Sequence, residues 1–391
     1  MFAGVNVEAR RAYAKAGMLY KLHLDLLYQC DLECEHCYLD DKKRRILPTD
    51  FWLGVLDQAA AMGVFTVTFS GGEIFLRKDL FTLIAHARSV GLFVHLKSHG
   101  GYIDPPAAAR LASLGVSSVA LSYYASDPAI HDAITRHAGS HAKTRAALEH
   151  LSRAGILTVA SCVVMQRNRD AWRTVIAECD ALGVFTNLDG HMLTAQSGAA
   201  FPHDLAVEHG DAIDLQRHLF GRFGLTESTE AFSTVASAAV RAQWGDQTSC
   251  GAAHTSLYVS PEGSVTPCVQ WPQPLGNLAN GTRLADLWRS PSGQLADLRK
   301  IRARDRVLCS TCEVREHCDF CAGQSFITTG NPTEAIAHIC VRTRIKTLAR
   351  AAALGLPDPP LPAGLRDADP AQTAPPAAAL RRFTVRAAPR T

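Results

Sequence analysis

The sequence predicts an α/β protein in which a partial barrel of parallel strands precedes a loop-rich domain held together by metal. Three observations support this prediction. Short β-rich runs alternate with amphipathic helical runs between about residues 21 and 204, three cysteines lie within residues 30–37, and seven more lie within residues 250–340. Such alternation indicates parallel strands covered by helices, and clustered cysteines are typical of metal sites.

Six short segments have the composition of buried strands. They are Lys21–Leu27, Thr66–Phe69, Phe93–Lys97, Ser118–Ser122, Thr158–Met165 and Val184–Leu188. Amphipathic stretches between them predict helices near 51–62, 78–90, 105–114, 142–154 and 170–182. Six such units are too few to close an eight-stranded barrel, so we expect a partial (β/α)6 barrel that binds its ligands at the carboxyl ends of the strands.

The chain divides into five segments by pattern and composition. A short N-terminal lead (1–20) precedes the barrel (21–204), and a helical connector (205–249) follows the barrel. Residues 250–354 contain a loop-rich stretch with many glycines and prolines, which we expect metal crosslinks to stabilise. The tail (355–391) is rich in proline and alanine and is expected to be disordered.

Composition excludes several classes of function. The 391 residues carry a formal net charge of +3 at pH 7, too little to indicate a nucleic-acid partner. No run of about 18 apolar residues exists, so we expect no membrane span. The first residues lack the apolar core of an export signal, so we expect a cytoplasmic protein whose twelve cysteines are metal ligands rather than disulfides.

Cys30, Cys34 and Cys37 form a CxxxCxxC pattern directly after the first expected strand. Thiolates are the usual ligands of iron–sulfur clusters, and a cubane cluster normally takes four of them. Three cysteines in one loop therefore leave one iron open to a chelating ligand, as in catalytic metal sites. A structural zinc site is the alternative, but it needs a fourth ligand, which His36 is poorly placed to supply.

With Tyr38 after the third cysteine, this pattern resembles the signature of the radical S-adenosylmethionine (SAM) superfamily. The resemblance implies that the predicted barrel is of the radical SAM type. It implies a [4Fe–4S] cluster whose open iron chelates the amino and carboxylate groups of SAM. One electron from the cluster would cleave SAM to a 5′-deoxyadenosyl radical, which abstracts a hydrogen atom from the substrate. Tyr38 is therefore a candidate SAM-binding residue.

The next part of the expected SAM site is Gly71-Gly72-Glu73, at the end of the second strand. Two glycines allow the backbone to approach a ligand closely. The resemblance assigns Glu73 to the SAM ammonium group, with which a carboxylate can form a charge-assisted hydrogen bond. The family usually has proline after this glutamate, where this chain has Ile74.

Three residues near later strand ends complete the candidate site. The resemblance places Ser122, at the end of the fourth strand, near the SAM ribose. Arg136 is a candidate partner for the SAM carboxylate, but a solvated helix charge is an equally good interpretation. His99 stands where relatives often have asparagine. It could face the site, although an exposed loop histidine is the favoured interpretation.

The second group of cysteines consists of Cys250, Cys268, Cys309, Cys312, Cys318, Cys321 and Cys340. The run from 309 to 321 has Cys-x2-Cys-x5-Cys-x2-Cys spacing and resembles the SPASM domain, whose usual pattern has three residues in the last gap. The resemblance implies two auxiliary iron–sulfur clusters. The outer cluster would be held by Cys309, Cys312, Cys318 and Cys340, and the inner cluster by Cys250, Cys268 and Cys321.

The inner cluster lacks a fourth cysteine, so its last position is either open or filled by His254 or a nearby oxygen. The two isolated cysteines, Cys162 and Cys179, are expected to pack as small buried hydrophobic residues. Zinc ribbons are the alternative for the whole region. Seven cysteines, however, do not divide into two four-ligand zinc sites without a borrowed histidine.

SPASM relatives act mostly on peptides, so the leading hypothesis is an oxidoreductase that matures a peptide or protein, with crosslink formation favoured. Its expected partners are a precursor peptide or protein, a separate leader-binding protein, and flavodoxin or ferredoxin as reductant. One alternative is an oxidoreductase acting on a small molecule such as a sugar, an aminoglycoside or a tetrapyrrole. Another is a non-catalytic iron–sulfur scaffold, which the intact cysteine, Gly71-Gly72-Glu73 and Ser122 motifs oppose.

Overall fold

The computed structural model describes residues 2–39, 41–190, 192, 194–196, 198, 199, 201–222, 245, 246, 248, 250–290, 293–306, 309, 312, 314, 315 and 318–355. The chain forms two compact units, each built from two separate stretches. The first contains Met1–Asp189 and Gly251–Ala296, and the second contains Gly190–Cys250 and Asp297–Thr391. Residues 223–244 of the expected connector and 356–391 of the expected tail lie outside the described residues.

The first unit contains a nine-stranded sheet in the order β6-β5-β4-β3-β2-β1-β7-β8-β9. Strands β1 to β6 are parallel, and each pairs with its neighbour along the chain. Their bounds are Lys21–Leu27, Thr66–Gly71, Phe93–Ser98, Ser118–Ser122, Thr158–Val163 and Phe185–Asp189. All six expected strands are confirmed, and the expected α/β architecture with a parallel sheet is confirmed with them.

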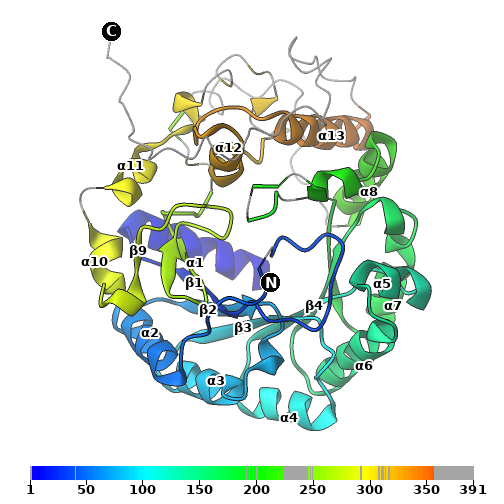
Figure 1. The fold of residues 1–391 in the computed structure, drawn as a ribbon. Helices are drawn as coiled ribbons and strands as arrows, with labels where there is room; N and C mark the ends of the chain where they lie inside the picture. The colour runs from blue at the N-terminus through cyan, green and yellow to red at the C-terminus, as the bar shows by residue number, and fades with distance from the viewer. Residues whose placement is uncertain are drawn as a thin grey trace. The chain divides into compact units, whose positions relative to one another are not determined.

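Helices cover the outside of this sheet, as Figure 1 shows for α2, α3 and α4. The bounds of the five expected helices are α2 Thr49–Ala61, α3 Leu80–Ser89, α4 Pro105–Ser113, α6 Ser140–Arg153 and α7 Trp172–Ala181. Helix α4 begins where Asp104 accepts a hydrogen bond from the Ala107 amide at 2.8 Å, directly before a proline. An aspartate N-cap followed by proline is a strong helix start.

Among residues 2–189, two helices were not expected from the sequence. Helix α1, Phe2–Ala16, precedes the sheet, and the Tyr13 ring packs against Tyr20 with centroids 5.3 Å apart. Helix α5, Pro128–Thr135, is only eight residues long and follows β4. It begins at Asp127, whose side chain accepts a hydrogen bond from the Ala129 amide at 2.8 Å. Its start signal was present in the sequence, but the apolar pattern was too short to stand out.

The two faces of the sheet differ in chemistry. On the face toward the helices, Leu22, Leu24 and Phe69 are completely buried. On the opposite face, polar residues stand in register across five neighbouring strands: Tyr258, His23, Thr68, His95 and Ser118. An apolar outer face holds the helices, and the polar inner face is therefore suited to surround a polar ligand.

The sheet extends beyond the six expected strands. Strand β7, Ser256–Val259, pairs in parallel with β1, and β8, Ser264–Thr266, and β9, Gly276–Asn277, follow antiparallel. The sequence predicts a loop-rich stretch at 250–340. These three strands have only two to four residues each, which is too short to show a periodic pattern. Strand β7 covers the edge of β1, so the hydrogen-bonding groups on that side of β1 are paired. The short helices α10, Leu284–Arg289, and α11, Gln294–Lys300, follow.

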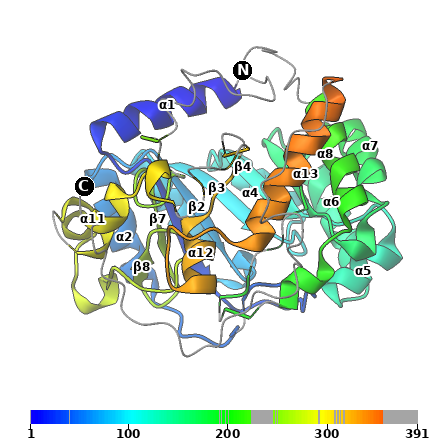
Figure 2. The same cartoon turned by 90° about the horizontal axis from the view of Figure 1, so that it is seen from above.

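The second unit contains helices α8, His209–Arg222, α12, Ala322–Thr329, and α13, Ala337–Ala353. Helices α8 and α13 pack side by side (Figure 2). Helix α12 begins at Cys321, whose sulfur accepts a hydrogen bond from the Gln324 amide at 3.5 Å. Within the described part of the chain, no helix combines the length and the apolar character needed to cross a membrane.

Candidate functional site

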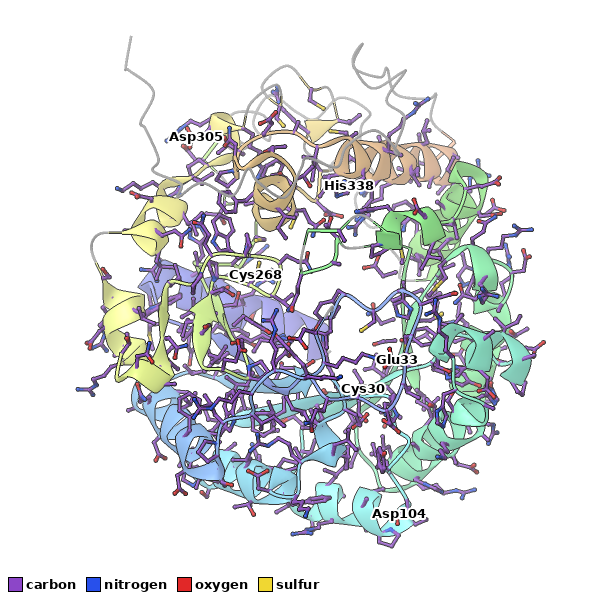
Figure 3. All side chains as sticks on the ribbon, in the orientation of Figure 1. Cys30, Glu33, Asp104, Cys268, Asp305 and His338 are labelled. Atoms are coloured by element: carbon purple, nitrogen blue, oxygen red, sulfur yellow. The ribbon has the colours of Figure 1, made fainter. Side chains whose placement is uncertain are left out.

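The loop that follows β1 carries the first three cysteines; we call residues 28–39 the cluster loop. Figure 3 places Cys30 and Glu33 on this loop, whereas Asp104 lies at the outer end of α4. The loop is fastened to the end of α5, because the Glu33 amide donates to the Thr135 carbonyl at 3.2 Å and the Glu35 amide to the Ile134 carbonyl at 3.0 Å. The short helix that the sequence pattern did not reveal thus supports the cluster loop.

The three thiols of the cluster loop are partly buried and interact with one another. Burial raises the pKa of Cys30 to about 11. Burial, with the neighbouring Cys37 and Cys30 thiols, raises the pKa of Cys34 to about 12. The three sulfurs therefore lie within electrostatic reach of one another, as ligands of one cluster must. Metal binding requires the thiolate form, so assembly of a cluster here releases protons.

Gly71 and Gly72 join the end of β2 to the cluster loop. The Gly72 amide donates to the Leu27 carbonyl at 2.8 Å, and the Glu73 amide donates to the Gln29 carbonyl at 2.8 Å. A Cβ on Gly72 would lie 2.1 Å from the Gln29 oxygen, and one on Gly71 would lie 2.0 Å from the Leu27 oxygen. From the sequence, the approach of a ligand is the reason for glycine at both positions. In the described residues, the neighbouring backbone carbonyl groups already leave no room for a Cβ at either position.

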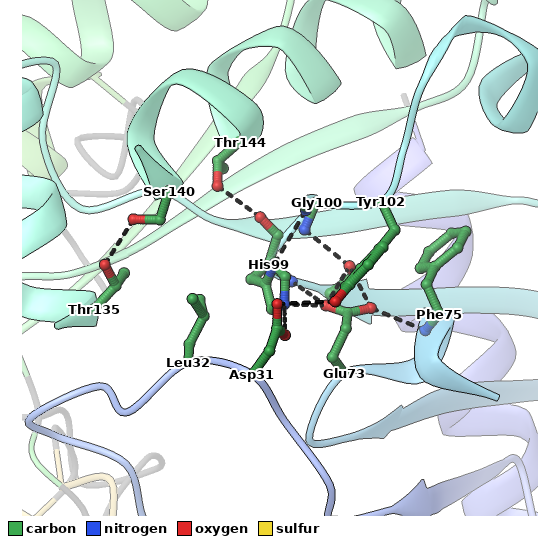
Figure 4. Close-up of polar contacts among 12 residues, drawn as sticks. Asp31, Leu32, Glu73, Phe75, His99, Gly100, Tyr102, Thr135, Ser140 and Thr144 are labelled. Carbon is green, nitrogen blue, oxygen red and sulfur yellow. Dashed lines mark hydrogen bonds and ion pairs between the residues drawn. The ribbon is translucent and has the colours of Figure 1, made fainter. Parts of the chain in front are cut away.

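Glu73 lies at the centre of a buried hydrogen-bond network (Figure 4). Its carboxylate accepts hydrogen bonds from the Ser98 hydroxyl at 2.9 and 2.8 Å and from the amides of Phe75 and His99, each at 2.9 Å. Burial is the main cause of the raised pKa of Cys30, and the charge of Glu73 raises it further. The carboxylate is therefore held rigidly within electrostatic reach of the first cysteine, where it can attract a cationic group.

His99 is not the exposed loop histidine that we favoured from the sequence. Its side chain is only 10% exposed, and Nε2 lies 2.9 Å from Asp31 Oδ1 and 3.1 Å from Glu73 Oε2. The Tyr102 hydroxyl donates to the other oxygen of Asp31 at 2.9 Å. The signal in the sequence was a histidine at position 99, where relatives often have asparagine. The longer imidazole side chain can reach the cluster loop. Asp31 and Tyr102 were missed altogether.

Tyr38, Ser122 and Arg136 lie on separate elements of the first unit. Burial raises the pKa of Tyr38 well above its usual value, and the charge of Asp25 adds to this. Ser122 is the last residue of β4. Arg136 is exposed at the end of α5, with a left-handed backbone at φ 55°. That these three residues contact SAM stays a prediction.

A second buried network, which the sequence did not reveal, lies on the inner face of the sheet. Asp25 is completely buried and accepts hydrogen bonds from the Tyr258 hydroxyl at 2.8 Å and from His23 at 3.0 Å. The hydroxyls of Tyr258 and Tyr28 lie 2.6 Å apart. Burial and the charge of Asp25 raise the pKa of Tyr258 far above its usual value. Because Tyr258 lies on β7, residues from the C-terminal half help to build the interior of the barrel.

In the second unit, the four cysteines expected to hold the outer cluster interact with one another. Burial raises the pKa of Cys309 to about 11, with a contribution from Cys318. Burial raises the pKa of Cys340 to about 12, with contributions from Cys318, Cys309 and Cys312. The four thiols therefore lie within electrostatic reach of one another, and the set fits one iron–sulfur cluster.

The inner set is divided between the two units. Burial raises the pKa of Cys321, and the Cys250 thiol contributes to the shift. Cys268 belongs to the first unit, and its place in the inner set stays a prediction. Cys162 is 1% exposed on β5 and Cys179 is 0% exposed on α7, so the expectation that both pack as buried hydrophobic residues is confirmed.

Comparison with known proteins agrees with this geometry. A model of the radical SAM superfamily matches residues 26–178, and a model of the SPASM iron–sulfur cluster-binding domain matches residues 250–319. The PqqA peptide cyclase of Rhodopseudomonas palustris is 27% identical over 327 residues, which are 79% of this chain and 83% of the relative. The PqqA peptide cyclase of Xanthomonas axonopodis pv. citri is 28% identical over 345 residues, which are 84% and 90% of the two chains.

Solved structures support the fold. Streptococcus suis SuiB bound to its precursor peptide SuiA has a TM-score of 0.64 and 16% identity, covering 84% of this chain and 78% of SuiB. The enzyme anSMEcpe with bound AdoMet has a TM-score of 0.64 and 16% identity, covering 86% of this chain and 98% of that chain. The resemblance seen in the sequence is therefore confirmed: residues 26–178 match the radical SAM superfamily and residues 250–319 match the SPASM iron–sulfur cluster-binding domain.

Proposed function

We propose that this chain is a radical SAM peptide maturase that oxidatively modifies a side chain of a peptide or protein, most readily by forming a crosslink. The observation that carries the proposal is the similarity to PqqA peptide cyclases over 79% and 84% of this chain, which extends across both the barrel and the cysteine-rich region. A small-molecule oxidoreductase is the second candidate, but nothing in the described residues favours it.

The residues of the first unit are suited to bind SAM and its cluster. When bound, the [4Fe–4S] cluster supplies the electron that cleaves SAM to a 5′-deoxyadenosyl radical. Cys30, Cys34 and Cys37 would hold the cluster through their thiolates, and the rigid Glu73 carboxylate would accept the SAM ammonium group. We assign the remaining contacts to Tyr38, Ser122 and Arg136 from the family resemblance.

The C-terminal cysteines would hold two auxiliary clusters, with Cys309, Cys312, Cys318 and Cys340 on the outer one. Cys250, Cys268 and Cys321 would hold the inner one, leaving its fourth position open or filled by His254. Crosslinking removes two hydrogen atoms from the substrate. A SAM-derived radical would account for one hydrogen atom, and an auxiliary cluster held by these cysteines would accept the electron of the other, whose proton is released to solvent.

We also propose the cellular setting and partners. The use of ten of the twelve cysteines as metal ligands suits the reducing cytoplasm. A flavodoxin or ferredoxin would supply electrons, and a separate leader-binding protein would present the precursor peptide.

The substrate proposal predicts a defined change of mass. In anaerobic incubation with SAM, a reductant and candidate precursor peptides, the modified peptide is expected to lose the mass of two hydrogen atoms and to gain a crosslink visible in tandem mass spectrometry. A variant with alanine at Cys30, Cys34 and Cys37 is the control and should leave the peptide unchanged. Oxidation of a sugar, aminoglycoside or tetrapyrrole with every peptide left intact would select the second candidate instead.

The cluster assignment predicts a metal content. The reconstituted protein is expected to bind three clusters, on the order of 8–12 irons per chain, since each set of thiolates holds one cubane or binuclear centre. Iron, sulfide and zinc analysis with Mössbauer spectroscopy measures this. A variant with serine at the buried Cys162 and Cys179 should retain the same iron. Anoxically purified protein with stoichiometric zinc and a single cluster would contradict the auxiliary-cluster assignment.

A further inference from the structure

The His99 side chain lies between two carboxylates that belong to different parts of the candidate SAM site (Figure 4). Nε2 is 2.9 Å from Oδ1 of Asp31, which is next to Cys30 on the cluster loop, and 3.1 Å from Oε2 of the buried Glu73. Neither the family resemblance nor the glycine-glycine-glutamate motif assigns a function to this imidazole. Its position nevertheless connects the cluster loop with the expected ammonium site.

The hydrogen-bond partners of the ring determine its tautomer. The Gly101 amide donates to Nδ1 of His99 at 3.0 Å, so Nδ1 is an acceptor and carries no proton. The single ring hydrogen is therefore on Nε2, where Asp31 Oδ1 accepts it at 2.9 Å, while Glu73 Oε2 lies 3.1 Å from the same nitrogen. A Cβ on residue 101 would lie 2.7 Å from the Cε1 atom of His99, so glycine at this position allows the close approach.

The backbone of His99 is also fixed by hydrogen bonds. The His99 amide donates to Glu73 Oε2 at 2.9 Å, and the His99 carbonyl accepts from the Thr144 hydroxyl at 2.6 Å. Asp31 is held on its other oxygen by the Tyr102 hydroxyl at 2.9 Å. Movement of Asp31, and with it of the start of the cluster loop, is therefore limited by two side chains that follow β3.

We propose that His99 is a positioning residue that couples SAM binding at Glu73 to the placement of the cluster loop. This inference rests on the proposed role of Glu73 as acceptor for the SAM ammonium group. An ammonium at Oε2 offsets the negative charge that lies 3.1 Å from Nε2, so the Nε2 hydrogen of His99 stays on Asp31 and holds the loop beside Cys30. By thermodynamic reciprocity, a loop held in this way binds SAM more tightly.

The test measures SAM affinity directly in anaerobic, cluster-reconstituted protein, by equilibrium dialysis with labelled SAM. His99→Leu removes the hydrogen bond to Asp31 and is expected to weaken SAM binding about tenfold or more, the effect of losing one hydrogen bond to a charged group. His99→Gln places an amide donor at a similar reach and should restore affinity to within about threefold of wild type. The EPR spectrum of the reduced SAM cluster should change less on SAM addition in His99→Leu than in wild type.

Two further variants make the result specific. His86→Asn removes another histidine–carboxylate pair, the exposed contact with Asp57 at 2.7 Å on the outer helices, and should leave SAM affinity unchanged. Asp31→Ala should weaken binding in wild type, but should add little to the loss already present in His99→Leu, because the two side chains act as one unit.

Wild-type affinity in His99→Leu or in Asp31→Ala, or additive losses in the double variant, would overturn the proposal. If His99→Leu does not retain its cluster, His99→Gln and Asp31→Ala are compared instead. Wild-type SAM affinity in Asp31→Ala, or an affinity of His99→Gln more than about threefold below wild type, would then overturn the proposal. The assay needs no peptide. Wild-type protein that binds SAM but modifies no peptide would therefore contradict the proposed function, whereas the role of His99 would still be decided by the SAM affinities of the variants. Wild-type protein that binds no SAM would overturn both.

Discussion

Alanine in place of Cys30, Cys34 and Cys37 together is expected to abolish 5′-deoxyadenosine formation while leaving substantial iron on the protein. These three thiols share one loop and interact with one another, so their removal takes away the whole ligand set of the SAM cluster. The C-terminal cysteines lie on separate elements and are unchanged, so their iron should remain. Chromatography of anaerobic, dithionite-reduced reactions measures the nucleoside, and metal analysis of the same samples measures the iron.

The matched control for this triple variant is alanine at Cys162 and Cys179, the two cysteines that are buried away from both groups. That double variant should form 5′-deoxyadenosine at the wild-type rate, although it loses some stability through its two small core cavities. Wild-type amounts of 5′-deoxyadenosine from the triple variant would remove the assignment of the cluster loop as the site of SAM cleavage.

Gly72→Ala is expected to be strongly destabilising. Its Cβ would lie 2.1 Å from the Gln29 carbonyl oxygen and 2.6 Å from that of Tyr28, and both are backbone atoms that cannot rotate away. Overpacking typically costs about 1–3 kcal/mol of unfolding free energy, and an overlap with two backbone carbonyl groups belongs at the upper end of that range. It also separates the end of β2 from the cluster loop, so iron bound at the SAM site should fall with stability. Denaturant unfolding and iron analysis of the purified variant measure the two effects.

Gly54→Ala provides the comparison for this substitution. Gly54 lies inside α2, and a Cβ there would meet no atom within 4 Å. Alanine is the better helix former by about 0.5–1 kcal/mol, so this variant should be slightly more stable than wild type and keep its iron. Equal unfolding midpoints for Gly72→Ala and wild type would show that the backbone contact does not constrain this position.

The sequence was most informative where a pattern is local and periodic. Strand β1 was predicted at its observed bounds because its leucines alternate with polar residues over the first six of its seven positions. The cluster loop was predicted because three cysteines lie within eight residues of one another. Helix α5 and strand β7 were missed because each is too short to show a period, although the Asp127-Pro128 start of α5 is a standard helix signal.

The parts of the site that the sequence did not reveal depend on contacts between distant positions. The hydrogen bond between Tyr258 and Asp25 joins residues 233 positions apart, and that between His99 and Asp31 joins residues 68 positions apart. No local pattern encodes such a pair, and each side chain alone has an ordinary explanation. The sequence suggests that Gly71 and Gly72 make room for a ligand. In the described structure, the atoms nearest to a Cβ at these positions are the carbonyl oxygens of Leu27 and Gln29.

The pairing of β7 with β1 has a consequence for how the protein is made. The ribosome adds about 5–20 residues per second, so the partner of β1 emerges on the order of tens of seconds after β1 itself. During that interval the nascent chain exposes one edge of β1 and leaves Asp25 without the hydroxyl of Tyr258. The barrel therefore cannot finish folding cotranslationally as an independent N-terminal domain. A fragment ending before residue 256 is expected to expose an open strand edge and to bind chaperones or aggregate.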